Sequence, residues 1–403
     1  MTMQIGSIAR LGSAALLLLC SLVACSDGDS GTPLVVRRDS AGVRIVEAMR
    51  PLWGDSSLWR IDPDPVVDLT LSGTGPAHEF YRAGSMKQRP DGSLAIADGS
   101  SREVRVFSET GEFQASFGGE GDGPGEFRRL RRIGNAGDTL LAFGDGRVTV
   151  VAPDLSVVRT FDVDFFTTDL HVLSGGAILP EMSRPVLPMD GLAGRVRRPE
   201  PLILFDLEGT LIDSIGEVRG PELYVLVRDG SYVGSAALWF ADRSHVAALG
   251  PHILRGSSDM MQVEELDASG NLVRILRIPD YPLDLSAAKI ATERSHVLDG
   301  FPPGSTSVLK TVLEAVPASG NRPAFADILV DPSGAVWLEL YRGESEQDQP
   351  QEWLVLRADG IWLGTVRIPD RFTLSDITMD AVLGVWRDEL DVAHPQVLQL
   401  TRN

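Results

Sequence analysis

The stretch that decides the fold is GSLAIADGSSREVRVFSETGEFQASFGGEGDGPGEF, residues 92–127. Apolar and polar side chains alternate here in short runs separated by turn residues, and this period of two predicts antiparallel strands joined by hairpins. The stretch ends in FGGEGDGPGEF, residues 117–127, which contains five glycines. Because these glycines match no phosphate-binding motif, we interpret the segment as a corner between one sheet and the next.

The same unit occurs more than once. GTGPAHEFYR begins at Gly73 and GDGPGEFRRL begins at Gly121, and each is followed by a turn and an alternating apolar run. The two runs end in Asp98 and Asp145, which are 47 residues apart. Further copies of the closing hairpin follow at 205–216, 266–280 and 356–370. Units of about 45 residues with four short strands are typical of β-propeller blades.

The closing hairpins give the number of blades. Five turns are centred on Gly111, Asp154, Gly209, Gly270 and Gly360. A sixth unit, 381–402, contains two strands and needs an outer strand from the other end of the chain, either 42–48 or 59–71. The sequence therefore predicts an all-β protein. It is a six-bladed β-propeller of four-stranded antiparallel blades over residues 35–403, closed as a ring by its N- and C-terminal strands.

One region departs from the strand pattern. Residues 286–298 and 306–316 have apolar side chains at helical spacing, and Ser286 is a suitable N-cap for the first of them. We expect a two-helix insertion at about 284–318, between the fourth and fifth blades. It either packs against one end of the ring or acts as a lid.

The N-terminus has the features of an export signal. A basic residue, an apolar run and a polar stretch follow one another in residues 1–24, which we interpret as a signal peptide. LVAC, ending at Cys25, resembles the lipobox of bacterial lipoproteins, in which the cysteine carries the lipid anchor. The resemblance implies a chain held on the cell envelope, at the outer membrane, by Cys25. Residues 25–34 would then be a flexible linker.

The net charge and the cysteine content argue against nucleic-acid binding and against disulfide bonds. The formal net charge is −19, so nucleic acid is not an expected partner. Cys20 lies in the segment to be removed and Cys25 is assigned to the lipid, so the mature domain is expected to fold without disulfides.

Residues 92–127 also resemble an NHL-type propeller repeat, through the order apolar-Ala-Asp, hydrophobic strand, glycine turn and F-G-x-x-G-x-G-P-G-x-F. With the lipobox, the entry strand DSAGVRIVE at 39–47 and the helical insertion, the chain resembles bacterial six-bladed β-propeller lipoproteins. The resemblance implies an envelope protein of a family that mostly has no assigned activity. Because a binding protein needs no catalytic group and the sequence contains no catalytic motif, the expected role is to bind or scaffold a protein partner or a small anionic or glycan ligand.

Four arginines are the candidate ligand-binding residues. Each lies where the innermost strand of a blade begins: Arg82, Arg129, Arg131 and Arg132. Strand alternation directs some of them toward the central channel, where bidentate contacts would hold a carboxylate, a sulfate or an acidic sugar. The alternative is that they pair with the many acids nearby, Glu120, Asp122 and Glu126 among them.

Catalytic signatures are absent from the sequence: it contains no H-E-x-x-H, G-x-S-x-G or C-x-x-C. Its six histidines have no recurrent metal spacing and are interpreted as turn or surface residues. No cofactor is expected. The alternative function is a metal-dependent hydrolase or lyase that resembles lactonase-like propellers and holds a divalent cation, such as Ca²⁺, in its channel. Its candidate ligands are Asp98, Asp145, Asp327 and Asp331.

Overall fold

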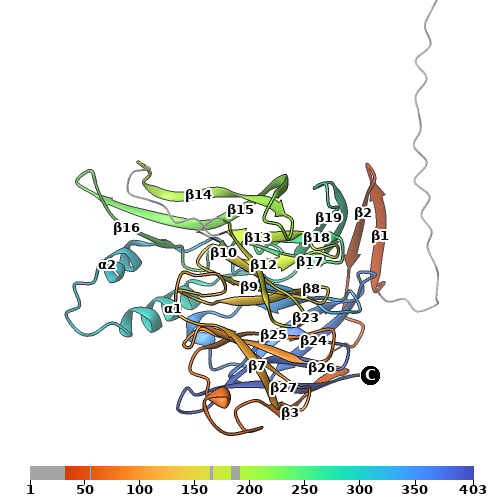
Figure 1. The fold of residues 1–403 in the computed structure, drawn as a ribbon. Helices are drawn as coiled ribbons and strands as arrows, with labels where there is room; N and C mark the ends of the chain where they lie inside the picture. Colours follow the sequence, from red (N-terminus) through yellow and green to blue (C-terminus); the bar gives the residue numbers. More distant parts are fainter. Residues whose placement is uncertain (1–31, 55, 164–166, 183–190) are drawn as a thin grey trace, which may run out of the picture. The chain divides into compact units, whose positions relative to one another are not determined.

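The computed structural model describes residues 32–54, 56–163, 167–182 and 191–403 (Figure 1). The signal segment 1–24 and Cys25 lie outside the described residues, so their assignments stay predictions. Within the described part of the chain, the strands form six sheets. We call the strands that begin at Ala83, Arg132, Thr167, Ser244, Phe325 and Phe372 the first strands, and number the sheets that contain them sheet 1 to sheet 6 in that order.

Four sheets have four strands each, all antiparallel. Sheet 1 contains β4 (Ala83–Gln88), β5 (Leu94–Asp98), β6 (Glu103–Phe107) and β7 (Phe113–Gly118). Sheet 2 contains β8 (Arg132–Ala136), β9 (Thr139–Gly144), β10 (Arg147–Val151) and β11 (Val157–Asp162). Sheet 5 contains β21 (Phe325–Val330), β22 (Val336–Leu340), β23 (Gln351–Leu356) and β24 (Trp362–Ile368). Sheet 6 contains β25 (Phe372–Ile377), β26 (Ala381–Arg387), β27 (Ala393–Arg402) and β3 (Trp59–Asp68).

The other two sheets have more strands than predicted. Sheet 3 contains β12 (Thr167–Val172), β13 (Ile178–Met182), β14 (Gly194–Phe205), β15 (Leu211–Arg228) and β16 (Ser231–Ala237). Sheet 4 contains β17 (Ser244–Leu249), β18 (His252–Ser257), β19 (Gln262–Leu266), β20 (Leu272–Arg277), β2 (Val43–Ala48) and β1 (Val35–Ser40). The prediction of four strands per blade is therefore wrong for these sheets. In sheet 3 the long β15 extends past β14 and pairs with β16, and in sheet 4 an N-terminal hairpin covers the edge strand β20.

Both candidate N-terminal segments are strands, but they join different sheets. The segment 59–71 supplies β3, which pairs antiparallel with β27, so that Val67 lies opposite Val397. The segment 42–48 supplies β2, which lies parallel to β20 with Ile45 opposite Ile275. The missing outer strand of sheet 6 is thus residues 59–68.

The predicted hairpin turns and the glycine corner are confirmed. Four turn glycines have φ between 80° and 89°: Gly111, Gly209, Gly270 and Gly360. A side chain at Gly270 would meet the Ile215 carbonyl oxygen at 2.3 Å, so only glycine fits there. In the corner between β7 and β8, the Phe127 amide donates to the Gly119 carbonyl at 2.9 Å, and the Phe127 ring is buried between sheets 1 and 2.

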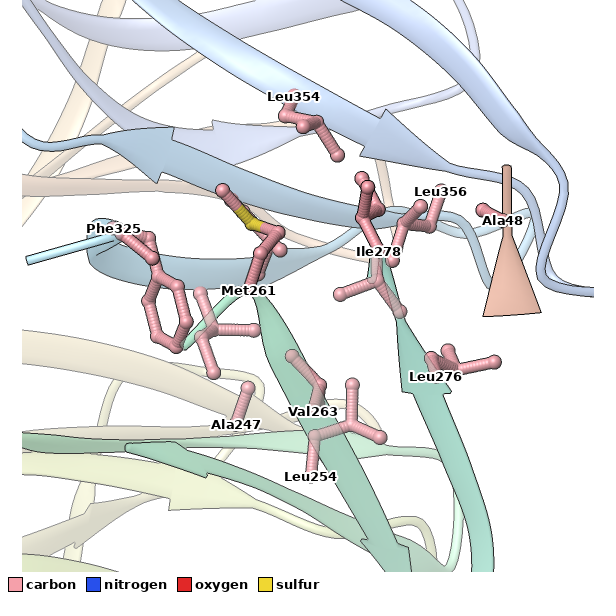
Figure 2. Packing of buried hydrophobic residues seen from close by; sticks show 14 of the residues in the cluster. Ala48, Ala247, Leu254, Met261, Val263, Leu276, Ile278, Phe325, Leu354 and Leu356 are labelled. Atoms are coloured by element: carbon pink, nitrogen blue, oxygen red, sulfur yellow. The ribbon is translucent and has the colours of Figure 1, made fainter. Parts of the chain in front are cut away.

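Hydrophobic side chains fill the space between neighbouring sheets. Between sheets 4 and 5, Met261, Val263 and Ile278 pack against Phe325 and Leu354, all of them buried (Figure 2). These side chains come from facing sheet surfaces, as expected for layers that bury their apolar faces against each other. Similar clusters lie between other neighbouring sheets.

The two predicted helices are present between sheets 4 and 5 as α1 (Ala287–Asp299) and α2 (Val308–Ala315). The Ser286 hydroxyl accepts from the Lys289 amide at 3.1 Å, which confirms the N-cap. The buried residues Val312 and Val316 pack with Trp239 beside β16 (Figure 1). Within the described residues, no helix has the length and apolar content that a bilayer-spanning helix requires.

Candidate functional site

Three aspartates occupy the same position on the first strands of three sheets. They are Asp169 on β12, Asp327 on β21 and Asp376 on β25, and each follows a register shift in the pairing with the second strand. The local sequences are also alike, TTDL, FADI and LSDI. Asp169 accepts from the amide of Leu170 at 2.7 Å and Asp327 from that of Ile328 at 2.8 Å. A bulge commonly redirects a side chain at functional sites, and here it places equivalent carboxylates.

Two of these aspartates are neutralised by a cation from a neighbouring sheet. Arg132 on β8 pairs with Asp169 at 3.0 Å, and Lys87 on β4 pairs with Asp376 at 2.8 Å. Among the described residues, Asp327 has no ion-pair partner, although it occupies the equivalent position. The three sites therefore share a backbone arrangement and differ in charge.

Asp327 lies among other carboxylates. Burial raises the pKa of Asp327 to about 7, and the charges of Glu181, Glu339 and Asp169 add to this effect. The hydrogen bond from the Ile328 amide stabilises the ionised form and acts in the opposite direction. Solvent still reaches part of its side chain, which is half-buried. Glu339 faces Asp327 across the β21–β22 pair, and burial raises its pKa although Gln351 donates a hydrogen bond to it. Near neutral pH, Asp327 is thus divided between its protonated and ionised forms.

A histidine completes the group. His171 Nε2 lies 3.2 Å from Glu181 Oε2. Burial lowers the pKa of His171, but the hydrogen bond with Glu181 and the charges of Asp169, Glu181 and Asp327 outweigh it and raise the pKa overall. We call five residues the first-strand cluster: Asp169, His171 and Asp327 on the first strands β12 and β21, and Glu181 and Glu339 on the second strands β13 and β22 that pair with them.

His245 is on β17, the first strand of sheet 4, and its side chain is buried. Burial, followed by the charge of Arg243, lowers its pKa to about 3, so His245 is neutral at physiological pH. Its ring packs against Phe325 at 5.5 Å between centroids. The interpretation of all six histidines as turn or surface residues is wrong for His171 and His245, because strand placement and burial are not visible in histidine spacing alone.

The four predicted arginines do not share one environment. Arg129 pairs with Asp145 at 2.5 Å and Arg132 pairs with Asp169 at 3.0 Å, so the alternative of neutralisation by acids describes these two arginines, through acids outside the glycine corner. Arg82 and Arg131 are exposed, and neither has an ion-pair partner among the described residues. These two arginines keep the charge that an anionic ligand would need.

The candidate metal ligands are also dispersed. Asp98 is buried and accepts from Ser100 Oγ at 2.8 Å and pairs with Arg105 at 3.2 Å, so it holds its own turn together. Asp145 is engaged by Arg129. No group of three or more histidines, cysteines, aspartates or glutamates is arranged to hold a metal ion among the residues that the structure describes.

Sequence reasoning missed most of the first-strand cluster. Asp169, Glu181 and Glu339 were not singled out, His171 was interpreted as a turn or surface residue, and Asp327 was considered only as a metal ligand. Aspartate followed by leucine or isoleucine recurs at 169, 327 and 376, but the same dipeptide also occurs at 68, 154, 206 and 284, so the sequence alone does not single out these aspartates.

Known structures resemble the fold. A protein of Bacteroides fragilis described as exported has 11% sequence identity and a TM-score of 0.50, with 88% of this chain and 98% of that chain covered. A DUF4221 protein of Bacteroides vulgatus has 10% identity and a TM-score of 0.51, with 86% and 99% covered. A streptogramin B lyase reaches a TM-score of only 0.40 at 11% identity, over 86% of this chain and 100% of that chain. These likenesses concern the fold alone.

No model of a known protein family matches the chain, and none of the curated proteins matches it in sequence. The class of the protein therefore rests on its architecture. Repeated sheets of antiparallel strands, packed face to face in chain order, define a β-propeller.

Proposed function

We propose that this protein is a lipid-anchored, six-bladed β-propeller of the bacterial cell envelope that binds its ligand at the first-strand cluster. The closed ring is supported by contacts between first strands in cyclic order, β4 with β8, β8 with β12, and onward through β17, β21 and β25 to β4. It is supported also by the pairing of β3 with β27, which joins the two ends of the domain. In such a ring the first strands line the central channel.

The envelope location is supported by the signal segment and by the similarity to an exported protein. We expect Cys25→Ser to move the protein from the membrane fraction to the soluble fraction after cell lysis, because the lipid on Cys25 is the anchor. Immunoblotting of both fractions measures the change, and Cys20→Ser serves as the matched control that stays with membranes. Membrane association of the Cys25 variant would contradict the anchor.

The ligand class follows from Asp327, which has no ion-pair partner among the described residues, unlike the equivalent Asp169 and Asp376. Arg132 and Lys87 show that the backbone position shared by Asp169 and Asp376 accepts a cation from outside its own sheet. At Asp327 no described residue supplies a cation within ion-pair distance; His171 interacts with its charge only at longer range, and three neighbouring carboxylates favour a positive charge there. We infer that the ligand supplies a primary ammonium group, from an amino sugar of a glycan or from a lysine of a protein partner.

Binding of ammonium compounds tests this assignment. We expect glucosamine or Nα-acetyl-lysine amide to bind detergent-solubilised protein at pH 7, and the one that binds identifies the source of the amine. Glucose is the neutral match to glucosamine and should not bind. Asp327→Asn should weaken binding at least tenfold, about 1.4 kcal/mol, because the amide removes the charge but keeps the shape. Isothermal titration calorimetry measures each affinity.

Asp376→Asn is the matched control, since Asp376 occupies the equivalent position but is already paired with Lys87. It should leave amine binding unchanged. Equal binding by wild type and Asp327→Asn would overturn the site. Binding of Ca²⁺, lost in Asp327→Asn and without any amine binding, would instead favour the metal-dependent hydrolase or lyase.

We propose a second ligand site at the exposed Arg82 and Arg131, which have no ion-pair partner among the described residues. They directly precede β4 and β8, the first strands of adjacent sheets, and their guanidinium groups would hold a sulfate or an acidic sugar. The binding partner would then present an anionic group to Arg82 and Arg131 and an amine to Asp327.

A further inference from the structure

A cavity of about 370 Å³ lies beside sheet 5, and none of its lining residues belongs to the first-strand cluster, although Glu339 directly precedes Leu340 of its wall. Its walls come from three segments that the fold brings together. Two are the beginning and the end of the helical insertion, 281–283 and 322–324, and the third runs from the end of β22 to β23, 340–352. Its volume falls in the range of about 300–1,000 Å³ typical of small-molecule sites.

The cavity has an apolar and aromatic side. Tyr281 and Tyr341 line it together with Pro282, Pro323 and Pro350. Burial raises the pKa of Tyr341 to about 12 and also raises that of Tyr281, so both phenols are neutral at physiological pH. These rigid side chains suit a flat or apolar ligand body, which loses little freedom of its own on binding.

The carboxylates of the cavity wall are already engaged. Glu346 forms an ion pair with Lys289 and accepts from the Gly343 amide at 3.0 Å, and Glu352 pairs with Arg367 at 3.2 Å. Arg322 donates to the Tyr341 carbonyl. The fixed negative charges on this wall therefore have their own cations.

Arg342 differs from the other charged residues of the cavity wall in its hydrogen-bond and ion-pair partners. Its Nη1 donates to the Gln349 carbonyl at 2.6 Å, which fixes the guanidinium at the cavity wall. Among the described residues, no carboxylate lies within ion-pair distance of Arg342, and its Nε is buried with no acceptor. Glu339 feels the charge of Arg342 at longer range. A guanidinium held in place by neutral carbonyls keeps its full charge for a ligand.

We propose that this cavity binds a small organic monocarboxylate with a flat or apolar body. Its carboxylate contacts the Arg342 guanidinium and its body packs against Tyr281, Tyr341 and the proline side chains. Charge-assisted hydrogen bonds of this kind are about twice as strong as neutral ones. The site is separate from the proposed amine site, and neither requires the other.

Benzoate is the probe, and benzamide is its neutral match of nearly the same shape. We expect isothermal titration of the full-length protein in detergent to show benzoate binding at least tenfold tighter than benzamide binding. Arg342→Gln should weaken benzoate binding at least tenfold. Leu283→Trp, which fills the cavity and leaves Arg342 intact, should weaken both compounds.

Arg357→Gln is the control, because Arg357 is an arginine of the same sheet that pairs with Asp359 away from the cavity. It should bind benzoate as wild type does. The proposal is overturned if benzoate does not bind, if benzamide binds equally well, or if Arg342→Gln and Leu283→Trp both bind benzoate as wild type does. Thermal melting of each variant separates lost binding from lost folding, and Asp327→Asn should leave benzoate binding unchanged.

Discussion

Replacing Asp331 by alanine is expected to lower the free energy of unfolding by about 4 kcal/mol, the usual loss when a buried charged group loses its partner. The Asp331 side chain is fully buried between β21 and β22. Its oxygens take up donors from four residues: Ser333 N (2.9 Å) and Oγ (2.6 Å), Ala335 N (3.0 Å), Trp337 Nε1 (3.0 Å) and Arg402 Nη1 (2.9 Å). Alanine would leave buried N–H groups without acceptors. Urea denaturation followed by circular dichroism measures the change.

Asp154→Ala is the matched control. Asp154 accepts from the Ser156 amide at 3.0 Å and from Ser156 Oγ at 2.6 Å, as Asp331 does with Ser333, but its turn is exposed and no ion pair is attached to it among the described residues. We expect a small fraction of the loss seen at Asp331, because water replaces the lost contacts. Equal losses in the two variants would contradict a special role for burial and for Arg402.

The size of the Asp331 effect also comes from the sheets that it connects. Asp331 belongs to sheet 5, whereas Arg402 is at the end of β27 in sheet 6. The Arg402 guanidinium lies 4.4 Å from the centre of the Trp59 ring on β3. A variant that releases Arg402 therefore weakens the place where the two ends of the domain pair. The sequence singled out Asp331 as a metal ligand, but donors from the protein already occupy both its oxygens.

Local features of the fold were predictable from the sequence because their causes are local. The turn at Gly270 needs a positive φ, the corner at Gly118 needs the same, and the N-cap of α1 needs a hydroxyl at Ser286. The parallel pairing of β2 with β20 and the length of β15 were not predicted. They depend on which edges are left uncovered after the sheets have formed, and no short stretch of sequence encodes that.

The candidate site was harder to predict than the fold. Lys87 and Asp376 are 289 residues apart in the chain, and Arg132 and Asp169 belong to different sheets. Which aspartate lacks an ion-pair partner among the described residues therefore depends on which sheets are neighbours and on the register shift before each aspartate. The arginines were visible as a cluster in the sequence, yet only tertiary structure shows that Arg129 and Arg132 are neutralised.

The variant Asp327→Asn should be more stable than wild type at pH 8 and equally stable at pH 4. In the unfolded chain Asp327 has an ordinary pKa near 3.8, and in the folded protein its pKa is about 7. Between these values the folded state binds the proton that the unfolded state has lost, so wild-type stability falls as pH rises and the loss is complete above pH 7. The full shift corresponds to roughly 4 kcal/mol, and we expect about 2 kcal/mol because the carboxylate is partly exposed.

The difference in stability between variant and wild type isolates Asp327 from the neighbouring groups with shifted pKa values, His171 and Glu339. It is measured as the difference in unfolding free energy at pH 4 and pH 8, with Asp376→Asn as control. That control loses the ion pair with Lys87 and should not be stabilised at pH 8. A stability difference that is the same at both pH values would show that Asp327 titrates normally. A bound ammonium group would neutralise the same unfavourable charge at Asp327. If Asp327→Asn stabilises the protein at pH 8, the wild-type carboxylate lowers the stability of the fold at the position where we propose that it binds the ligand.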